Sequence, residues 1–123
     1  MKKISIVITL FAIIWFSCTN ASFTPSGFDC SEEVSYNTNM KGLIDTYCAY
    51  SGCHLGAVGW GDYTSYAGME PFFTGIIEER VISLSEDPDI GMPPDYAEDG
   101  PIDLLPEDFM LINCWIQQGF PEN

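Results

Sequence analysis

The chain is predicted to fold mostly as α-helices, for two reasons. Apolar residues recur at helical spacing after residue 39, where Met40, Leu43, Ile44 and Tyr47 fall on one face. A second clear helix lies near the C-terminus, and no segment alternates apolar and polar residues as a half-buried strand does. With 123 residues, the chain holds one domain at most.

The N-terminus has the pattern of an export signal. Lys2 and Lys3 give a short positive start, and Ile4 to Phe16 is a run of thirteen residues without charge. That run is too short to span a bilayer, which takes about 20 apolar residues, but it is typical of a signal-peptide core. We therefore expect residues 1–17 to be an export signal.

The residues after this run resemble a lipid-anchor site. Ser17-Cys18 follows the apolar run as a small residue and a cysteine do in the lipobox of bacterial lipoproteins, which implies lipidation of Cys18 and a membrane anchor. Cleavage after Ala21 would instead release a soluble exported protein. We expect residues 18–29 to be a tether, because small and polar residues dominate there. The folded domain is then 30–123, in the bacterial cell envelope, in the periplasm or on the outer-membrane surface.

The charge of the exported part restricts its partners. Without the signal, only Lys41 and Arg80 remain against 18 acidic residues. So acidic a surface repels nucleic acid and anionic lipid headgroups, and at low salt it attracts proteins with a basic face. Solubility alone is the other interpretation of this charge.

Two helical segments are expected in the first half of the domain. The first runs from about Asn39 into Cys48, with Asn37, Thr38 or Asn39 available as its cap. A glycine-rich loop over 55–62 follows. A helical turn over 63–68 is expected next, with Asp62 as its cap.

The second half begins with another helix and ends with the clearest one. The apolar face of the former is Phe72, Phe73, Ile76, Ile77 and Val81.

Residues 85–101 contain four prolines and many acids, so they cannot form a regular element. In the last helix Pro106 suits the first position, while Gly119 and Pro121 end it. Its apolar face combines Ile112, Trp115 and Ile116.

The stretch CAYSGCHLG carries the main chemical signal. Cys48 and Cys53 are followed at once by His54, the only histidine in the chain. Covalent haem attachment needs two thiols for the two vinyl groups on one edge of the porphyrin, and a histidine beneath the ring. The usual spacing leaves two residues between the cysteines, and this one leaves four, with Gly52 available to ease the wider turn. On these residues alone, a small disulfide loop between Cys48 and Cys53 is the alternative. A zinc site lacks a fourth ligand of the right type nearby.

Two further motifs extend this pattern. Gly91-Met92-Pro93-Pro94 lies in the irregular segment, and Trp115-Ile116-Gln117-Gln118-Gly119 ends the last helix. Together with the cysteine loop, they resemble the class I cytochrome c family, in particular small exported bacterial cytochromes with a C-x-x-S-G-C-H loop, a Met-Pro-Pro loop and a terminal W-I-x-x-G helix. The resemblance covers about 36–123.

The resemblance implies a fold of three to five short helices around one covalent haem c, with the first and last helices crossing. It implies thioether bonds at Cys48 and Cys53, His54 as the proximal iron ligand and Met92 as the distal one. Methionines 40, 69 and 110 fit packing positions better. Trp115 is expected to be a core residue.

The resemblance also concerns the remaining cysteines. Cys30 precedes the first predicted helix and Cys114 lies within the last one. If these helices cross as in the family, the two cysteines come within bridging distance, and we expect a structural disulfide, as an oxidising compartment allows.

Acidic residues of the irregular segment raise the question of calcium. The candidate ligands are Asp87, Asp89, Asp95, Asp99 and Asp103. None of them falls in the twelve-residue calcium-loop pattern, so a solvated loop is the preferred interpretation.

The function expected from the sequence is one-electron transfer between redox partner proteins in the envelope, without enzymatic activity. Two alternatives stay open. One is a disulfide-stapled extracellular binding or adhesion module without haem. The other is a haem enzyme or sensor whose sixth iron position is open.

Overall fold

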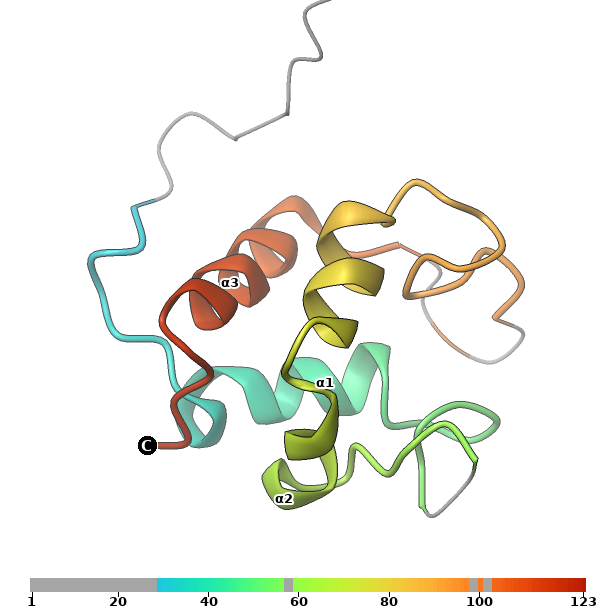
Figure 1. The fold of residues 1–123 in the computed structure, drawn as a ribbon, viewed down its shortest axis with the longest axis horizontal. Coiled ribbons are helices and arrows are strands. Elements are labelled where there is room, and N and C mark those ends of the chain that lie inside the picture. The colour runs from blue at the N-terminus through green and yellow to red at the C-terminus, as the bar shows by residue number, and fades with distance from the viewer. Residues whose placement is uncertain (1–28, 57–58, 98–99, 101–102) are drawn as a thin grey trace, which may run out of the picture.

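The computed structural model describes residues 29–56, 59–97, 100 and 103–123, and these form helices, turns and loops without any strand (Figure 1). The prediction of a mostly helical fold is confirmed for this part of the chain. The expected export signal, Cys18 and almost all of the expected tether lie outside the described residues. Within the described part, no helix is long and apolar enough to cross a membrane.

The first helix consists of a π-helical turn, η1 (Tyr36–Met40), that continues into α1 (Lys41–Tyr47). It begins three residues earlier than predicted, after Ser35, whose backbone is extended. The predicted caps are therefore wrong, because Asn39 lies inside the helix and its side chain accepts a hydrogen bond from the Ser35 amide at 3.0 Å. The predicted apolar face is buried, as its four residues show: Met40, Leu43, Ile44 and Tyr47.

A short helix, α2 (Tyr66–Met69), follows the predicted loop and leads into a 3-10 turn, η2 (Glu70–Phe72). Its cap is Ser65 rather than Asp62, because the Ser65 hydroxyl accepts a hydrogen bond from the Gly68 amide. The Asp62 carboxylate instead accepts hydrogen bonds from the amide and hydroxyl of Thr64, at 3.0 and 2.6 Å.

The helix predicted across residues 72–81 is interrupted. Gly75 adopts a left-handed φ of +84°, which ends the first piece and is a conformation that residues with a side chain rarely adopt. A second piece starts at Ile76 and contains the π-helical segment η3 (Glu78–Ser83). The predicted apolar face is buried only in part, since Phe73 and Ile77 are buried while Ile76 is exposed.

The last helix, α3 (Pro106–Gln117), agrees with the prediction at both ends. Pro106 occupies its first position, where the missing amide proton costs nothing. At the other end Gly119 has a φ of +81°. The amide of Gly119 donates to the Ile116 carbonyl and that of Phe120 to the Trp115 carbonyl, both at 3.0 Å, which is the Schellman pattern.

The first and last helices contact each other where the chain also ends, as Figure 1 shows for the C-terminus beside the start of η1. The Tyr36 amide donates to the Pro121 carbonyl at 2.8 Å. Cys30 and Cys114 form a disulfide, which confirms the predicted pair. We call the segments 30–40 and 112–121 together the stapled end.

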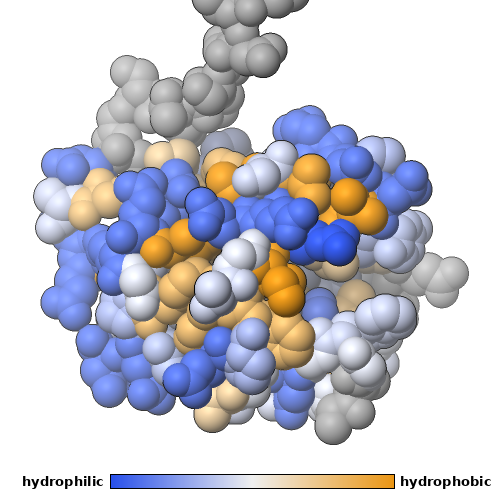
Figure 2. All heavy atoms as spheres, in the orientation of Figure 1, coloured by the Kyte–Doolittle hydropathy of each residue, from blue (hydrophilic) through white to orange (hydrophobic). Residues whose placement is uncertain are grey.

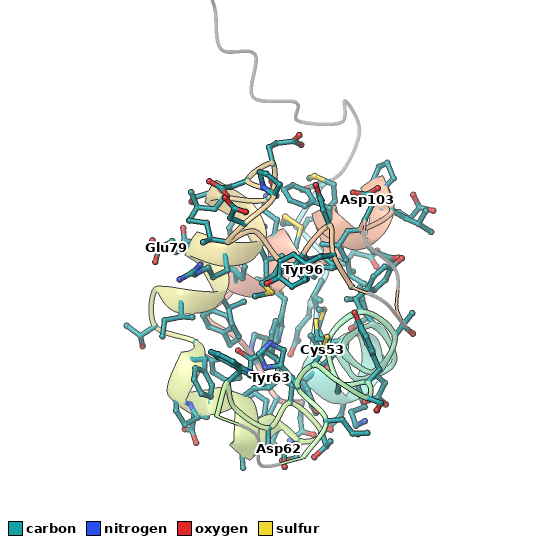
Figure 3. The ribbon with its side chains drawn as sticks, turned by 90° about the vertical axis from the view of Figure 1, so that its right-hand side faces the viewer. Cys53, Asp62, Tyr63, Glu79, Tyr96 and Asp103 are labelled. Atoms are coloured by element: carbon teal, nitrogen blue, oxygen red, sulfur yellow. A yellow bond between two sulfur atoms is a disulfide. The ribbon has the colours of Figure 1, made fainter. Side chains whose placement is uncertain are left out.

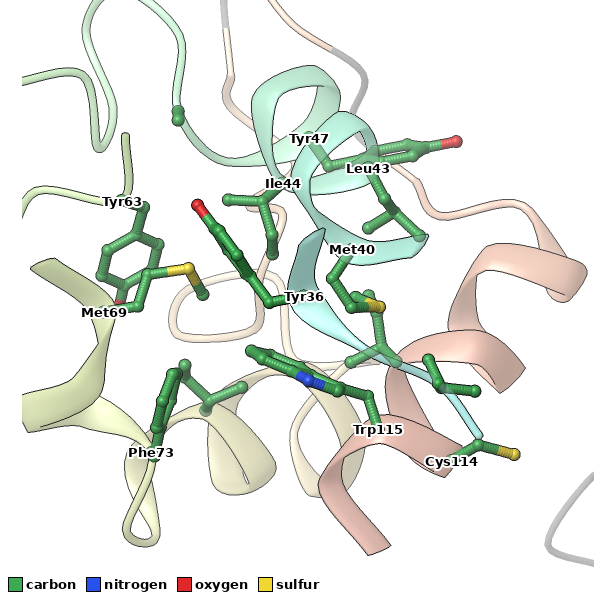
Figure 4. Close-up of a cluster of buried hydrophobic side chains, with 14 residues drawn as sticks. Tyr36, Met40, Leu43, Ile44, Tyr47, Tyr63, Met69, Phe73, Cys114 and Trp115 are labelled. Atoms are coloured by element: carbon green, nitrogen blue, oxygen red, sulfur yellow. The ribbon is translucent and has the colours of Figure 1, made fainter. Parts of the chain in front are cut away.

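Aromatic packing fills the core next to the disulfide (Figure 4). Trp115 is fully buried, and its indole N–H donates to the Pro121 carbonyl at 2.9 Å. The rings of Phe73 and Phe120 meet it edge-on at 5.3 and 5.0 Å between centroids. Trp115 is therefore a core residue, as predicted. On the surface, Figure 2 shows apolar side chains gathered between hydrophilic ones across the middle of one face.

Candidate functional site

A pocket of about 580 Å³ lies between the first helix, the turns after it, α2, η3 and α3. Most of its lining side chains are aliphatic or aromatic, and Trp115 and Ile112 form part of its buried wall. Figure 3 looks toward it, with Cys53 and Tyr63 on one side and Tyr96 on the other. This volume falls within the range of about 300–1,000 Å³ that is usual for small-molecule and cofactor sites.

The structure brings the four predicted site residues to this one pocket. Cys48, Cys53 and His54 enter it from the turn after α1, and Met92 enters from the loop after η3. All four side chains are half-buried. The two cysteines are free thiols, so the structure contains no bond between them.

The four residues between the cysteines form a closed turn. The Cys53 amide donates to the Tyr50 carbonyl at 3.1 Å, and the His54 amide donates to the Cys48 carbonyl at 3.0 Å. Gly52 has a φ of +88°, so the glycine singled out in the sequence does provide the left-handed residue of this turn. The wider spacing is thus accommodated with both thiols lining the same pocket.

His54 is held by two neighbours that the sequence did not reveal. Its ring stacks on Tyr63 with centroids 3.9 Å apart, and its Nδ1 lies 3.4 Å from the Gly61 carbonyl. Because a carbonyl only accepts, this contact favours the tautomer with the proton on Nδ1, in which Nε2 keeps its lone pair. Burial lowers the pKa of His54, which favours the neutral ring that binds metals.

Glycine is required at position 61 by close packing. Gly61 has a φ of +100°, and a Cβ there would lie 2.5 Å from the ring of Phe72. The carbonyl that orients His54 therefore belongs to a residue with no room for a side chain. The signal available in the sequence was only the glycine-rich composition of 55–62.

Burial keeps two further groups of the pocket in their neutral forms. It raises the pKa of Cys48 to about 12, with a smaller contribution from Cys53. It likewise raises the pKa of Tyr63 to about 12, with a smaller contribution from Cys48. A pKa raised in this way lowers the fraction of reactive thiolate at Cys48.

Met69, which the sequence predicts to be a packing residue, also lines the pocket. It is 1% exposed and lines the same pocket as Met92, so it is a second thioether within the site. Met40 and Met110 are buried outside the pocket lining, as packing residues. Helical spacing cannot separate these cases, because both kinds of position point inward.

Exposed apolar side chains surround the mouth of the pocket. Trp60 and Tyr96 are 72% and 67% exposed, and Ile76 and Ile90 are also exposed, yet all four line the pocket. We call these four residues the rim. Exposed apolar side chains that gather in one place mark contact sites for a ligand or a partner.

In the acidic loop, the side chain of Asp87 binds the backbone of the residues that follow it. The Asp87 carboxylate accepts hydrogen bonds from the amides of Asp89 and Ile90, at 3.0 and 3.2 Å. Among the residues that the structure describes, no group of three or more His, Cys, Asp or Glu side chains is arranged to hold a metal ion. Asp99 lies outside the described residues.

No protein-family model, curated protein or solved structure matches the chain. The resemblance to class I cytochromes c therefore rests on the motif residues alone.

Proposed function

We propose that the protein is an electron carrier with one covalently attached haem c, held by thioether bonds at Cys48 and Cys53. His54 is the proximal iron ligand and Met92 the distal one. The observation that carries this proposal is the meeting of all four residues in one pocket, although Met92 is far from the cysteine motif in sequence.

The pocket fits such a group in volume, polarity and donor set. Its volume of about 580 Å³ lies in the range for cofactors, and its walls are mainly apolar. It offers two thiols on one turn, one imidazole and thioether sulfurs. When bound, haem iron supplies reversible one-electron oxidation, and histidine–methionine ligation raises its potential.

The chain's own residues do three things for this chemistry. The Gly61 carbonyl and the Tyr63 ring orient His54 and keep its proton on Nδ1. Trp115 and Ile112 exclude water from the inner wall because they are buried there. The rim leaves the pocket mouth apolar and accessible, which suits contact with a partner protein.

The partners and the location follow from charge and from the N-terminal signal. We propose redox partners with a basic docking face, because the exported chain carries 18 acids against two basic residues.

Export to the envelope and lipid attachment at Cys18 are part of the same proposal. Radiolabelled palmitate incorporated into the wild type but not into Cys18→Ser would support the anchor, and equal labelling of both proteins would contradict it.

The test is to express the chain with a cytochrome c maturation system and to record optical spectra and denaturing mass. We expect a sharp α-band on reduction and a haem-sized mass increment that survives denaturation. A matched Cys48→Ser/Cys53→Ser variant from the same system should lack the increment. The oxidised protein should show the weak deep-red band that methionine ligation gives ferric haem.

Other outcomes would select the alternatives. A colourless wild-type protein with Cys48 bonded to Cys53 would overturn the haem proposal and leave a stapled extracellular module. Covalent haem with high-spin features and ready carbon monoxide binding would keep the cofactor but replace electron transfer by an open-iron function. The half-buried position of Met92 in the pocket favours the ligated state over this second case.

A further inference from the structure

One cationic side chain, that of Arg80, lines the pocket. On so acidic a protein an ion pair with a carboxylate would be expected, but its guanidinium donates a hydrogen bond to a backbone carbonyl. Arg80 is the only arginine in the sequence. It lies on η3, is half-buried, and lines the pocket together with Met92. In the described part of the chain it forms no ion pair; Lys41 and Asp45 form the salt bridge there.

Arg80 instead binds the loop that carries Met92. Its guanidinium Nη1 donates to the Ile90 carbonyl at 3.0 Å. Its own backbone carbonyl accepts from the Met92 amide at 3.0 Å. Arg80 therefore binds the loop at Ile90 and at Met92, the two residues on either side of Gly91.

The loop has little room to shift at this point. Gly91 is buried, and its amide donates to the Asp87 carbonyl at 2.8 Å. A Cβ on Gly91 would lie 2.4 Å from the Leu84 carbonyl oxygen and 2.7 Å from that of Asp87. The backbone at Gly91 thus lies close to the Leu84 and Asp87 carbonyls, and the residues on either side of it are hydrogen-bonded to Arg80.

We infer that Arg80 is a positioning residue, which holds the 84–92 loop on η3 so that the Met92 sulfur is presented to the pocket. This inference rests on the proposed function, because it concerns the distal side of the haem site. A thioether is a weak ligand compared with imidazole, and the pocket contains a competing thioether at Met69. Which sulfur faces the iron therefore depends on how firmly the loop is held.

The first measurement uses the matured holoprotein and the deep-red methionine band. Arg80→Gln removes the charged donor at similar length, and we expect a loss of band intensity with the α-band and the covalent mass unchanged. Arg80→Lys keeps one donor and should recover part of the band. Lys41→Gln is the matched control, because it removes one charge from a helix face outside the pocket and should leave the band intact.

A second variant reaches the same loop without touching the charge. Gly91→Ala places a methyl group against the two carbonyls, so we expect the same loss of the methionine band. A purely structural role for Arg80 would lower the thermal midpoint while leaving the band intact at low temperature. The band and the midpoint therefore separate positioning from general stability.

The third measurement is hydrogen exchange at the Met92 amide, which donates to Arg80. We expect about tenfold faster exchange in Arg80→Gln than in the wild type, since a hydrogen bond from a charged group is lost from the loop. The Tyr36 amide, which donates to Pro121 at the opposite end, should be unchanged.

The results separate the inference from the proposed function. A wild-type protein with covalent haem but no methionine band would contradict Met92 ligation, and the exchange rate would still decide whether Arg80 holds the loop. An Arg80→Gln protein with the wild-type band and wild-type exchange would overturn the inference and leave the cytochrome assignment untouched.

Discussion

The two cysteine pairs lie in parts of the molecule that are built differently. At the stapled end, Cys30 and Cys114 are bonded to each other, the Tyr36 ring lies against Trp115, and backbone hydrogen bonds join the start of the first helix to the segment after α3. Around the pocket, Cys48 and Cys53 are free, the chain is mostly turns, and apolar side chains are exposed at the rim. We call the segments 48–56, 59–63 and 80–96 together the pocket side.

This difference indicates what each part needs for its stability. At the stapled end, Trp115 is fully buried by the protein itself and its indole N–H is paired. The pocket side leaves apolar surface facing a hollow, which costs free energy until a ligand covers it. A cofactor bound there would therefore act as the missing core of that side.

The largest expected effect comes from breaking the stapled end. Cys30→Ala with Cys114→Ala removes a crosslink between residues 84 positions apart, which in the chain-entropy model stabilises by about 4–5 kcal/mol. We expect a loss of that order, or less if the native bond is strained, in both the haem-free and the haem-bound protein. Denaturant unfolding of both forms measures it. A loss confined to the haem-bound form would mean that the staple serves the pocket rather than its own end.

The next effect concerns haem and should be confined to the pocket side. Hydrogen exchange of the matured wild type is compared with that of the Cys48→Ser/Cys53→Ser variant. We expect amides of the pocket side to exchange at least about tenfold more slowly in the haem-bound protein, because ligand binding suppresses local opening. The segments 34–40 and 117–121, which do not line the pocket, should differ little. Equal slowing of both parts would show that the two sides are not independent.

The stapled end and the pocket side also differ in how well the sequence predicts them. At the stapled end, Pro106 and Gly119 bracket α3 as expected, because caps and breakers act locally. The start of the first helix was harder to predict. It lies after Ser35, whose amide donates to the Asn39 side chain, and this contact has no clear signal in the sequence. The Cys30–Cys114 pair follows from the implied crossing of the first and last helices, because two cysteines 84 positions apart carry no local signal of their pairing.

On the pocket side, the residue types could be predicted but not their supports. Cys48, Cys53, His54 and Met92 carry recognisable chemistry in the sequence, and they do line one pocket. The supports of His54 could not be found, because a carbonyl and a stacked ring come from a turn whose course depends on tertiary packing. Gly75 also shows the limit of periodicity, since its left-handed backbone divides a helix whose apolar pattern continues across it.

A smaller effect separates the two thioethers of the pocket. Met92→Leu should abolish the methionine band, whereas Met69→Leu should keep it. Since leucine conserves much of the volume of the fully buried Met69, the second change should cost less than about 1.5 kcal/mol in the free energy of unfolding. Optical spectra and denaturant unfolding give both quantities. The reverse pattern in the spectra would assign the distal position to Met69.

The smallest effect tests whether turns of the pocket side are held by their own polar contacts. The Thr64 hydroxyl and then its amide donate to Asp62, and these bonds lower the pKa of that carboxyl. Thr64→Ala removes the hydroxyl, so we expect the Asp62 pKa to rise toward the ordinary value of about 3.9.

The sign of the linked effect on stability follows from the direction of this shift. A lowered pKa in the folded state means that the unfolded chain binds the proton first as the pH falls. The contribution of Asp62 is therefore complete above about pH 4 and is lost as the pH falls through its folded pKa, and Thr64→Ala should reduce it. Carboxyl NMR titration measures the shift. Thr46→Ala is the matched control, because the Thr46 hydroxyl donates to the Gly42 carbonyl and to no carboxylate. An Asp62 pKa that is the same in both variants would mean that the turn before α2 owes its shape to packing against Phe72 and Tyr63 rather than to its hydrogen bonds.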